Sequence, residues 1–469
     1  MPRKLSINLL TFMLILLLAL PAWGKTLTLE ESVALALEQG PAGRMLQRAK
    51  KLELAGPQGK AITLRPQLKL SGGANWGERP VEWNPLYAIG GMEPPESPLS
   101  FNQQEISVDF HKAVWMTPAL RALKEGIHWE TELAELSEQK GQADLIYQVI
   151  EAYVGLLRAR QMVTLAEEGL HIAQWKMDTV QEQYEAGVAT IAEVITAEAD
   201  LAEARMNKLA TDDMLKTAQM GFNTLVGLPA DSLVEPVDLA DPLQRVPTLE
   251  EAMALAARQR PGLRRAQVEL ELAQLEVLAA QEEGRPVVSL IGQYEWKDIT
   301  AGGSLSSNGY FGASSTYSRL DTGAGTGDDD DDDSSWVLGV NIQIPLLDGG
   351  GAKLRRDVAD DGVQLAQLAL ELEEAQTELE LFTLWAAVER AQAQLELADT
   401  RVKEMKERLR TIRELRAVQM ATELDVAQLE LAALQAQISR ANARYDLHLA
   451  QAAYLKGIGS PQLLVERIR

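Results

Sequence analysis

The feature that most constrains this chain is an internal repeat. Residues 28–36 (TLEESVALA) recur as TLEEAMALA at residues 248–256, and Arg65-Pro66 recurs as Arg285-Pro286. Further matched pairs lie later in each copy: Leu70 and Leu290, Gly72 and Gly292, Trp76 and Trp296, Val194 and Val426, Gly227 and Gly459, Pro229 and Pro461. Because self-similarity on this scale means that one structural unit is present twice, we expect two similar halves.

The repeat also sets the predicted boundaries. Residues 25–229 form the first repeat, residues 230–247 a proline-containing linker, and residues 248–469 the second repeat. Residues 1–24 begin with Arg3 and Lys4, continue with an apolar run and end with small residues, which is typical of a cleaved secretory signal peptide. The apolar run is shorter than the ~20 residues that a membrane-spanning helix needs.

Each half is expected to contain short helices, then a β-hairpin, then long helices. The predicted hairpins are residues 66–115 and 286–345, which gives four strands per chain. Strand residues alternate: one face of residues 287–296 holds Val288, Leu290, Gly292, Tyr294 and Trp296. Alternation over about ten residues, with aromatic residues near one end, is typical of a transmembrane β-strand. A half-exposed soluble hairpin is the alternative for any single strand.

Four strands are too few to close a membrane barrel, since ~8 is the smallest bacterial example. Open strand edges are not tolerated in the hydrocarbon layer, where unpaired backbone groups find no water. The barrel must therefore be completed by other copies of the chain. Three copies would supply twelve strands, and the sequence alone would also permit two or four copies.

After each hairpin the sequence becomes helical for a long distance, at residues 118–226 and 352–456. Thr117-Pro118 has the form of a helix cap followed by proline at the first helical position. Some 65 residues at ~1.5 Å each give a helix of about 100 Å, which indicates a strut. Each strut is expected to turn back near Gly187 or Gln419.

Both return helices carry an apolar heptad seam, which is typical of helices packed side by side. The seam of the second half comprises Leu424, Ala427, Leu431, Leu434, Ile438, Ala441, Tyr445, His448, Ala452 and Leu455. The equivalent seam of the first half comprises Ala192, Ile195, Ala199, Ala202, Met206 and Leu209. That first seam fails at Asp213 and Lys216, so the rest of this helix should pack differently.

The net charge and the absence of catalytic or ligand-binding motifs argue against nucleic-acid-binding proteins and enzymes. The net charge is −23, which argues against nucleic-acid binding because that rests on Lys and Arg at phosphates. The histidines His111, His128, His171 and His448 are far apart, and the glycines at residues 349–351 lack the pattern of a phosphate loop. We therefore expect no enzyme activity, no cofactor and no metal site. For the acidic run at residues 328–333, a solvated outer loop is favoured over divalent-cation binding.

Several motifs resemble TolC-type outer-membrane efflux proteins over essentially the whole mature chain. They are the Thr-Leu-Glu-Glu openings, the Arg-Pro strand entries, IPLLDGG at residues 344–350, YEAGVATIAEV at residues 184–194 and LVGLP at residues 225–229. The resemblance implies a homotrimer in the outer membrane with a large periplasmic part: a twelve-stranded barrel on a long helical barrel. It further implies an exit duct that works with a periplasmic adaptor (membrane fusion) protein and an inner-membrane transporter.

The fold class expected is thus mainly α with a membrane β-barrel contribution. A periplasmic helical adaptor or scaffold without a pore is the alternative. The exported substrate stays open, as does the choice between an RND-type efflux partner and an ABC-type secretion partner.

The resemblance also implies a gate at the two helix turns, near Gly187 and Gln419. Two aspartates that form constricting rings in the family correspond here to Asp425 and Gln428, so one carboxylate is kept. Glu193 lies at the matching position of the first half, where we expect it nearer the helix interface than the pore axis. Family positions that latch the gate fall on Ala421 and Arg416, so the latch is expected to differ. The first half also has AVWMTP at residues 113–118 where the second has the PLLDGG strand exit.

Residues 77–102 and 297–335 are predicted to be loops that face the cell exterior. The second, richer in Gly and Ser, should be the longer and more mobile of the two.

Overall fold

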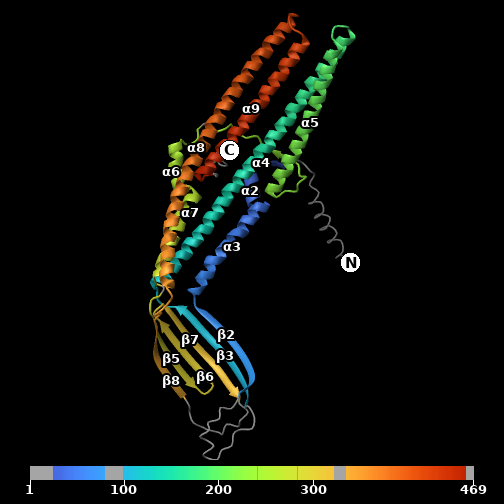
Figure 1. Cartoon of the computed structure of the whole chain (residues 1–469). Coiled ribbons are helices and arrows are strands. Elements are labelled where there is room, and N and C mark those ends of the chain that lie inside the picture. The colour runs from blue at the N-terminus through green and yellow to red at the C-terminus, as the bar shows by residue number, and fades with distance from the viewer. Residues whose placement is uncertain are drawn as a thin grey trace, which may run out of the picture. The chain divides into compact units, whose positions relative to one another are not determined.

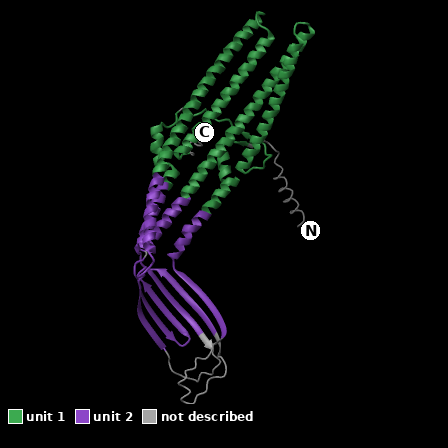
Figure 2. Cartoon of the chain, viewed as in Figure 1, with its two compact units in different colours: residues 1–51, 135–265, 371–469 green, residues 52–134, 266–370 purple. Residues whose placement is uncertain are grey.

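A computed structural model describes residues 25–79, 99–239, 241–243, 245–282, 284–321 and 334–460. The signal peptide expected at residues 1–24, the acidic run at residues 328–333 and Pro461 lie outside these ranges. The chain divides into two compact units (Figure 2). Unit 1 comprises residues 1–51, 135–265 and 371–469, and unit 2 comprises residues 52–134 and 266–370. Each unit draws segments from both halves of the sequence.

The order of elements is repeated along the chain (Figure 1). The first half contains β1 (Lys25–Leu27), α2 (Leu29–Glu38), α3 (Pro41–Thr63), β2 (Gln67–Arg79), β3 (Leu99–Ala113), α4 (Pro118–Glu185) and α5 (Ile191–Val226). The second half contains β4 (Val234–Pro236), α6 (Leu249–Gln259), α7 (Pro261–Glu282), β5 (Val287–Trp296), β6 (Ile299–Ser306), β7 (Tyr310–Asp321), β8 (Ser334–Gln343), α8 (Gly351–Ala417) and α9 (Glu423–Ile458). A short helix pair, sheet strands and two long helices therefore occur in this order twice.

Unit 2 contains an antiparallel sheet with the order β2-β3-β7-β6-β5-β8. The prediction of four strands is wrong: this sheet has six. The additional hairpin, β6–β7, lies between β3 and β5 within residues 297–335, which the sequence analysis assigned entirely to a mobile outer loop. The Gly- and Ser-rich composition of this segment made its strand alternation too weak to recognise. Residues 77–79 and 99–102 of the other predicted loop also belong to strands, and residues 80–98 lie outside the described part of the chain.

Several helices begin at a threonine that caps the free amides of the first turn. Thr28, Thr190, Thr248 and Thr422 each cap a helix in a capping box, in which the threonine and the third helical residue exchange hydrogen bonds. Thr117 caps α4, with its Oγ1 accepting from the Leu120 amide at 3.3 Å. The two return helices both end at a glycine in the left-handed conformation, Gly227 and Gly459.

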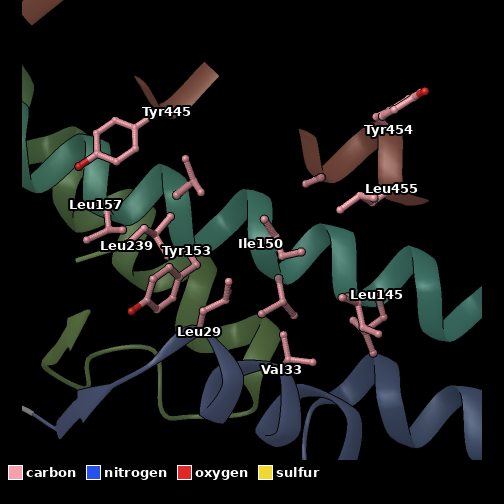
Figure 3. Close-up of a cluster of buried hydrophobic side chains, with 14 of the residues drawn as sticks. Leu29, Val33, Leu145, Ile150, Tyr153, Leu157, Leu239, Tyr445, Tyr454 and Leu455 are labelled. Atoms are coloured by element: carbon pink, nitrogen blue, oxygen red, sulfur yellow. The ribbon is translucent and has the colours of Figure 1, made fainter. Parts of the chain in front are cut away.

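The hydrophobic core of unit 1 lies where the short helices of both halves meet the long ones (Figure 3). Side chains of α2, including Leu29 and Val33, pack with Ile150 and Leu157 of α4. Tyr153 is fully buried at this junction, and its hydroxyl donates to the carbonyl oxygens of Leu27 at 2.9 Å and Val237 at 2.7 Å. The buried Tyr153 and its hydrogen bonds therefore attach the predicted linker, which includes β4, to the long helix α4.

The same arrangement occurs in the second half. The Tyr454 hydroxyl donates to the carbonyl oxygens of Pro247 at 3.0 Å and Thr248 at 3.3 Å. Burial raises the pKa of Tyr153 to about 12, and burial also raises the pKa of Tyr454 to about 12. A buried hydroxyl that donates to backbone carbonyls resists ionisation, since its charged form would lose both solvation and the donated proton.

Within unit 1, ion pairs define the lateral order of the long helices as α5-α4-α9-α8 (Figure 1). Lys176 on α4 pairs with Asp200 on α5 at 2.6 Å. On α9, Asp446 pairs with Arg158 of α4 at 2.5 Å, and Glu430 pairs with Arg413 of α8 at 2.7 Å. The helices α5 and α8 thus lie at the two edges.

The heptad seam of α9 is buried or half-buried along its whole length, as expected for helices packed side by side. The seam predicted on α5 is not buried in the chain, where Ile195, Met206 and Leu209 are 59%, 62% and 64% exposed. The helix α5 instead buries a neighbouring face that includes Val194, Ala197, Leu201, Phe222 and Val226. Because α5 lies at an edge, only one of its two apolar faces meets another helix of the same chain.

Among the helices that the structure describes, none is both long enough and apolar enough to cross a membrane.

Candidate functional site: the two helix turns of unit 1

The turns α4–α5 and α8–α9 lie at one end of unit 1 and have the same backbone design (Figure 1). Gly187 has φ +73° and Gln419 has φ +60°, so both occupy the left-handed region that residues with a side chain rarely adopt. The amide of each donates to a carbonyl oxygen three residues back, in Tyr184 and Arg416, at 2.9 Å. The structure thus places a turn between α4 and α5 and another between α8 and α9.

Asp425 is the third residue of α9 and closes its capping box. The Thr422 amide donates to Asp425 Oδ2 at 2.8 Å, the Thr422 hydroxyl donates to the same oxygen at 2.6 Å, and the Asp425 amide donates to Thr422 Oγ1 at 3.2 Å. These bonds, the hydroxyl's first, hold the pKa of Asp425 below its usual value. The carboxylate is exposed and stays ionised at neutral pH.

Glu193 has the same role at the start of α5. The Thr190 amide donates to Glu193 Oε2 at 2.6 Å and the Thr190 hydroxyl donates to it at 3.0 Å. The backbone bond, followed by the side-chain bond, lowers the pKa of Glu193. Within this one chain, Asp425 and Glu193 are therefore chemically equivalent: each is an exposed, ionised capping carboxylate.

Gln428 lies one helical turn after Asp425 and is also exposed. Residues three apart share a face of a helix, so the two side chains lie on the same side of α9. The structure thus brings Asp425 and Gln428 together on one side of α9. Ala421, at a position associated with the latch in the family, is half-buried.

Polar contacts near the turns connect α8 with α9. Arg416, the other latch position, forms an ion pair with Glu423, and Arg413 pairs with Glu430. These two pairs join the members of one helical hairpin, and the sequence reasoning did not find them. The seven-residue spacing of Arg416 and Glu423 across a turn was the signal that could have found the first.

Near the turns, an apolar contact joins the two hairpins. Leu424 of α9 packs against a small cluster at the start of α5 and the end of α4, which contains Val180, Val194 and Ala197. Leu424 belongs to the predicted seam, but its contact with this cluster could not be read from the sequence. Its partners come from the other half of the chain.

A pocket in unit 1, away from the two turns, shows no grouping of catalytic residues among its described lining. This polar pocket, of about 990 Å³, lies where α4, α7, α8 and the end of α9 approach one another. Two of its cations are engaged by acids within it: Arg260 by Glu380 at 2.6 Å, and Lys456 by Asp144 at 2.6 Å. Across the described ranges, no three His, Asp or Glu side chains are grouped so that they could hold a metal ion.

The chain combines a six-stranded antiparallel sheet in unit 2 with two long helical hairpins. The chain belongs to the outer membrane efflux protein family, whose model matches residues 62–228 and 252–460. Both halves are matched, in agreement with the internal repeat.

Individual relatives are distant. The chain is similar to the outer membrane efflux protein BepC of Brucella suis biovar 1 (strain 1330), with 25% identity over 322 residues. That match covers 68% of this chain and 64% of BepC, so the chain spans less than two thirds of this relative's length.

Solved structures show the fold. The outer membrane protein VceC from Vibrio cholerae has a TM-score of 0.69 and 17% identity, and the match covers 92% of this chain and 96% of VceC. The outer-membrane channel OprN has a TM-score of 0.70 and 18% identity, and covers 92% of this chain and 90% of OprN. The mainly helical fold class with a strand contribution is therefore confirmed.

Proposed function

We propose that this protein is an outer-membrane exit duct of a tripartite efflux pump or a type I secretion system. Substrates pass through it passively from the periplasmic side to the exterior, and it has no catalytic role. The observation that carries the proposal is the two-sided sheet of unit 2. On one face, exposed apolar residues such as Leu70, Val108, Leu290 and Val340 face outward, whereas the opposite face is rich in Ser, Asn and Gln. An apolar outer band with a polar inner face suits a strand wall in lipid around water.

The edges of the chain support a ring of copies. The sheet ends in β2 and β8, and because it is antiparallel with an even number of strands, these two edges run in opposite directions. β8 of one copy can then pair antiparallel with β2 of the next, which removes every open edge when the ring closes.

The helical edges support the same ring. α5 has its unpaired apolar seam, and α8 has another, made of exposed residues spaced at alternating intervals of three and four: Leu365, Leu368, Leu372, Ala375, Leu379 and Phe382. Contacts between neighbouring copies along these two edges would bury both seams. We propose a homotrimer on the strength of the family, with outer-membrane lipid around the sheet, most of the helices in the periplasm, and an adaptor and an inner-membrane transporter as partners.

Fractionation and bilayer recordings test this proposal. The expected result is a heat-resistant trimer that leaves the outer-membrane fraction only with detergent and conducts ions in planar bilayers. Release without detergent, together with absence of conductance, would instead support a pore-free periplasmic scaffold.

We further propose that the turns near Gly187 and Gln419 form the periplasmic mouth and that Asp425 lines its axis. In a trimer, Asp425 becomes a ring of three carboxylates, with Gln428 as a neutral ring one turn away. Like charges in such a ring attract cations and should bind polyvalent ones. Glu193 is expected at the interface between helices, away from the axis.

The equivalence of the two caps provides a matched control. Asp425→Ala and Glu193→Ala remove the same capping bonds, so any difference between them reports position relative to the pore and not loss of a cap. Asp425→Ala should lower cation selectivity and trivalent-cation block in planar bilayers more than Glu193→Ala does. Equal effects would mean that Asp425 only caps its helix.

A further inference from the structure

The hairpin β6–β7 is the feature that distinguishes the second half from the first. Its strands are inserted between β3 and β5 with continuous register: Ala113 to Asn102 of β3 pair with Tyr310 to Asp321 of β7, and Ser289 to Trp296 of β5 pair with Ser306 to Ile299 of β6. The hairpin therefore widens the sheet from within and is not an appendage at its edge.

One face of the hairpin continues the apolar face of the sheet. Ile299, Leu305 and Tyr317 pair with Trp296, Leu290 and Ile106 on the neighbouring strands. These three hairpin residues are 40%, 38% and 38% exposed, so the described part of the chain does not cover them fully. Phe311 contacts Phe110 edge-on, with ring centroids 6.3 Å apart.

The opposite face of the hairpin is polar and made of small residues. It comprises Thr300, Gly302, Ser304 and Ser306 on β6 and Gly312, Ser314, Thr316 and Ser318 on β7, with Tyr310 as a larger residue at the start of β7. Ser306 Oγ lies 2.8 Å from Ser289 Oγ of β5, which joins the hairpin to the polar face of its neighbour. Residues 299–318 contain no Asp, Glu, Lys or Arg. A neutral segment with one apolar and one small polar face matches the lipid-facing and water-facing sides of a membrane strand.

The turn of the hairpin is fixed to the strand ends. The Gly309 carbonyl accepts from the Val114 amide at 2.8 Å, and the Ser307 amide donates to the Val288 carbonyl at 2.7 Å. Gly309 has φ +98°, and a Cβ there would lie 2.6 Å from the Trp115 carbonyl oxygen, so the backbone approach requires glycine. The turn thus contacts the start of β5 and the segment that follows β3, which argues against a movable lid.

We propose that β6 and β7 are membrane-spanning strands of the channel wall, so that three copies of the six-stranded sheet close a barrel of eighteen strands. The proposal rests on the trimeric channel proposed above. With 8 and 12 residues, β6 and β7 are close to the ~9–11 that a tilted membrane strand needs. Barrel diameter grows roughly linearly with strand number, so the outer exit is about 1.5 times as wide as twelve strands would make it. The hairpin adds mainly small neutral residues to the lining of this exit, which leaves the added width open to bulky cargo.

Single cysteines test the orientation of the hairpin, because the chain contains none of its own. In reconstituted trimers, Ser304→Cys and Ser314→Cys should react with a charged, membrane-impermeant thiol reagent. Ala301→Cys and Ala313→Cys, on the apolar face, should not react with it, and a fluorophore attached there beforehand should be quenched by nitroxide lipids. Reaction on both faces would overturn the proposal.

Two control variants distinguish failure of the hairpin proposal from failure of the proposed channel. They are Ser107→Cys, on the polar face of β3, and Ala74→Cys, on the apolar face of β2. If the two control positions show polar-face labelling and apolar-face protection while the hairpin does not, the hairpin proposal alone fails. If the controls also fail to alternate, the proposed channel fails.

Deletion of residues 299–321 tests the strand number. β5 and β8 stay paired in that variant through their own ladder, which runs from Val287 opposite Gln343 to Trp296 opposite Ser334. In planar bilayers with polyethylene glycols added to either side, the radius excluded from the wider mouth should fall to about two thirds. An unchanged cut-off would overturn the eighteen-stranded closure.

Discussion

The return helices α5 and α9 are copies that have diverged in what they contact. Both contain 36 residues, both begin at a threonine capping box, and both end at a left-handed glycine. Yet Ala427 and Leu434 on the seam of α9 are 0% and 7% exposed, whereas the corresponding seam of α5 faces solvent. Duplication thus gave both helices two apolar faces. The position of each helix in the lateral order decides whether its second apolar face packs against a helix of the same chain or stays exposed for another copy.

The largest expected effect comes from placing a charge on either seam. Leu434→Asp buries a carboxylate between helices of one chain and should destabilise the chain by about 3–5 kcal/mol, because it removes apolar contacts and adds an unpaired charge. Met206→Asp alters an exposed residue, so it should change the stability of the isolated chain by less than about 0.5 kcal/mol. It should nevertheless abolish the trimer.

Circular dichroism in denaturant measures the first effect, and the yield of heat-resistant trimer measures the second. Met214→Asp, on the same helix but beyond the predicted seam, is the control for added charge. If Met206→Asp assembles as well as this control does, α5 is not the edge through which copies associate.

The two buried tyrosines permit a second comparison between the halves. Tyr153→Phe and Tyr454→Phe each remove a donor from two backbone carbonyls, and although those of Leu27 and Thr248 keep an amide donor, in Val237 and Ala252, the loss should cost about 1–3 kcal/mol. The larger cost is expected for Tyr153, whose bonds of 2.7 and 2.9 Å are shorter than the 3.0 and 3.3 Å of Tyr454. Urea unfolding at neutral pH measures the difference.

Alkaline titration sharpens that comparison. Both tyrosines have a folded pKa of about 12, above the ordinary value of about 10, so the unfolded chain ionises first. Their contribution to stability is complete below pH 10 and is lost as the pH rises from 10 to 12. Each Tyr→Phe variant should lose less stability than the wild type over this window, and equal losses would mean that the hydroxyls are not buried in solution.

Much of the fold could be predicted from the sequence because its signals are local. Thr117-Pro118 correctly marks the start of α4, and the alternation of Leu68 to Trp76 correctly marks β2. The hairpin β6–β7 was missed because glycine and serine dominate residues 299–318, and such composition is typical of loops. Its period-two pattern of Ile299, Ala301, Gly303 and Leu305 is present, but small side chains make it weak.

The site was predictable in position but not in contacts. Asp425 and Glu193 follow a threonine by three residues, which is the signature of a capping box. Which face of α5 packs inside the chain could not be read, because apolar periodicity is present on both faces and says nothing about neighbours. The same limit concealed the contact of Leu424 with Val180, since the two residues belong to different halves.

The smallest effect concerns the residues at the two turns. Gln419 adopts φ +60°, where a residue with a Cβ is disfavoured by about 1–2 kcal/mol, and glycine carries no such penalty. Part of the gain is offset because glycine makes the unfolded chain more flexible, by about 0.4–1 kcal/mol. Gln419→Gly should therefore stabilise the α8–α9 turn by about 0.5–1 kcal/mol.

Gly187→Ala is the reciprocal change at the α4–α5 turn. No atom lies within 4 Å of the Cβ that it would add, so its cost should come from the φ of +73° alone. Hydrogen exchange at the first turns of α9 and α5 measures the two effects separately, with slower exchange expected in Gln419→Gly and faster exchange in Gly187→Ala. Faster exchange in Gln419→Gly would show that the glutamine side chain stabilises its turn by more than the backbone strain costs. In that case Gln419 would be a functional departure from the glycine of the first half.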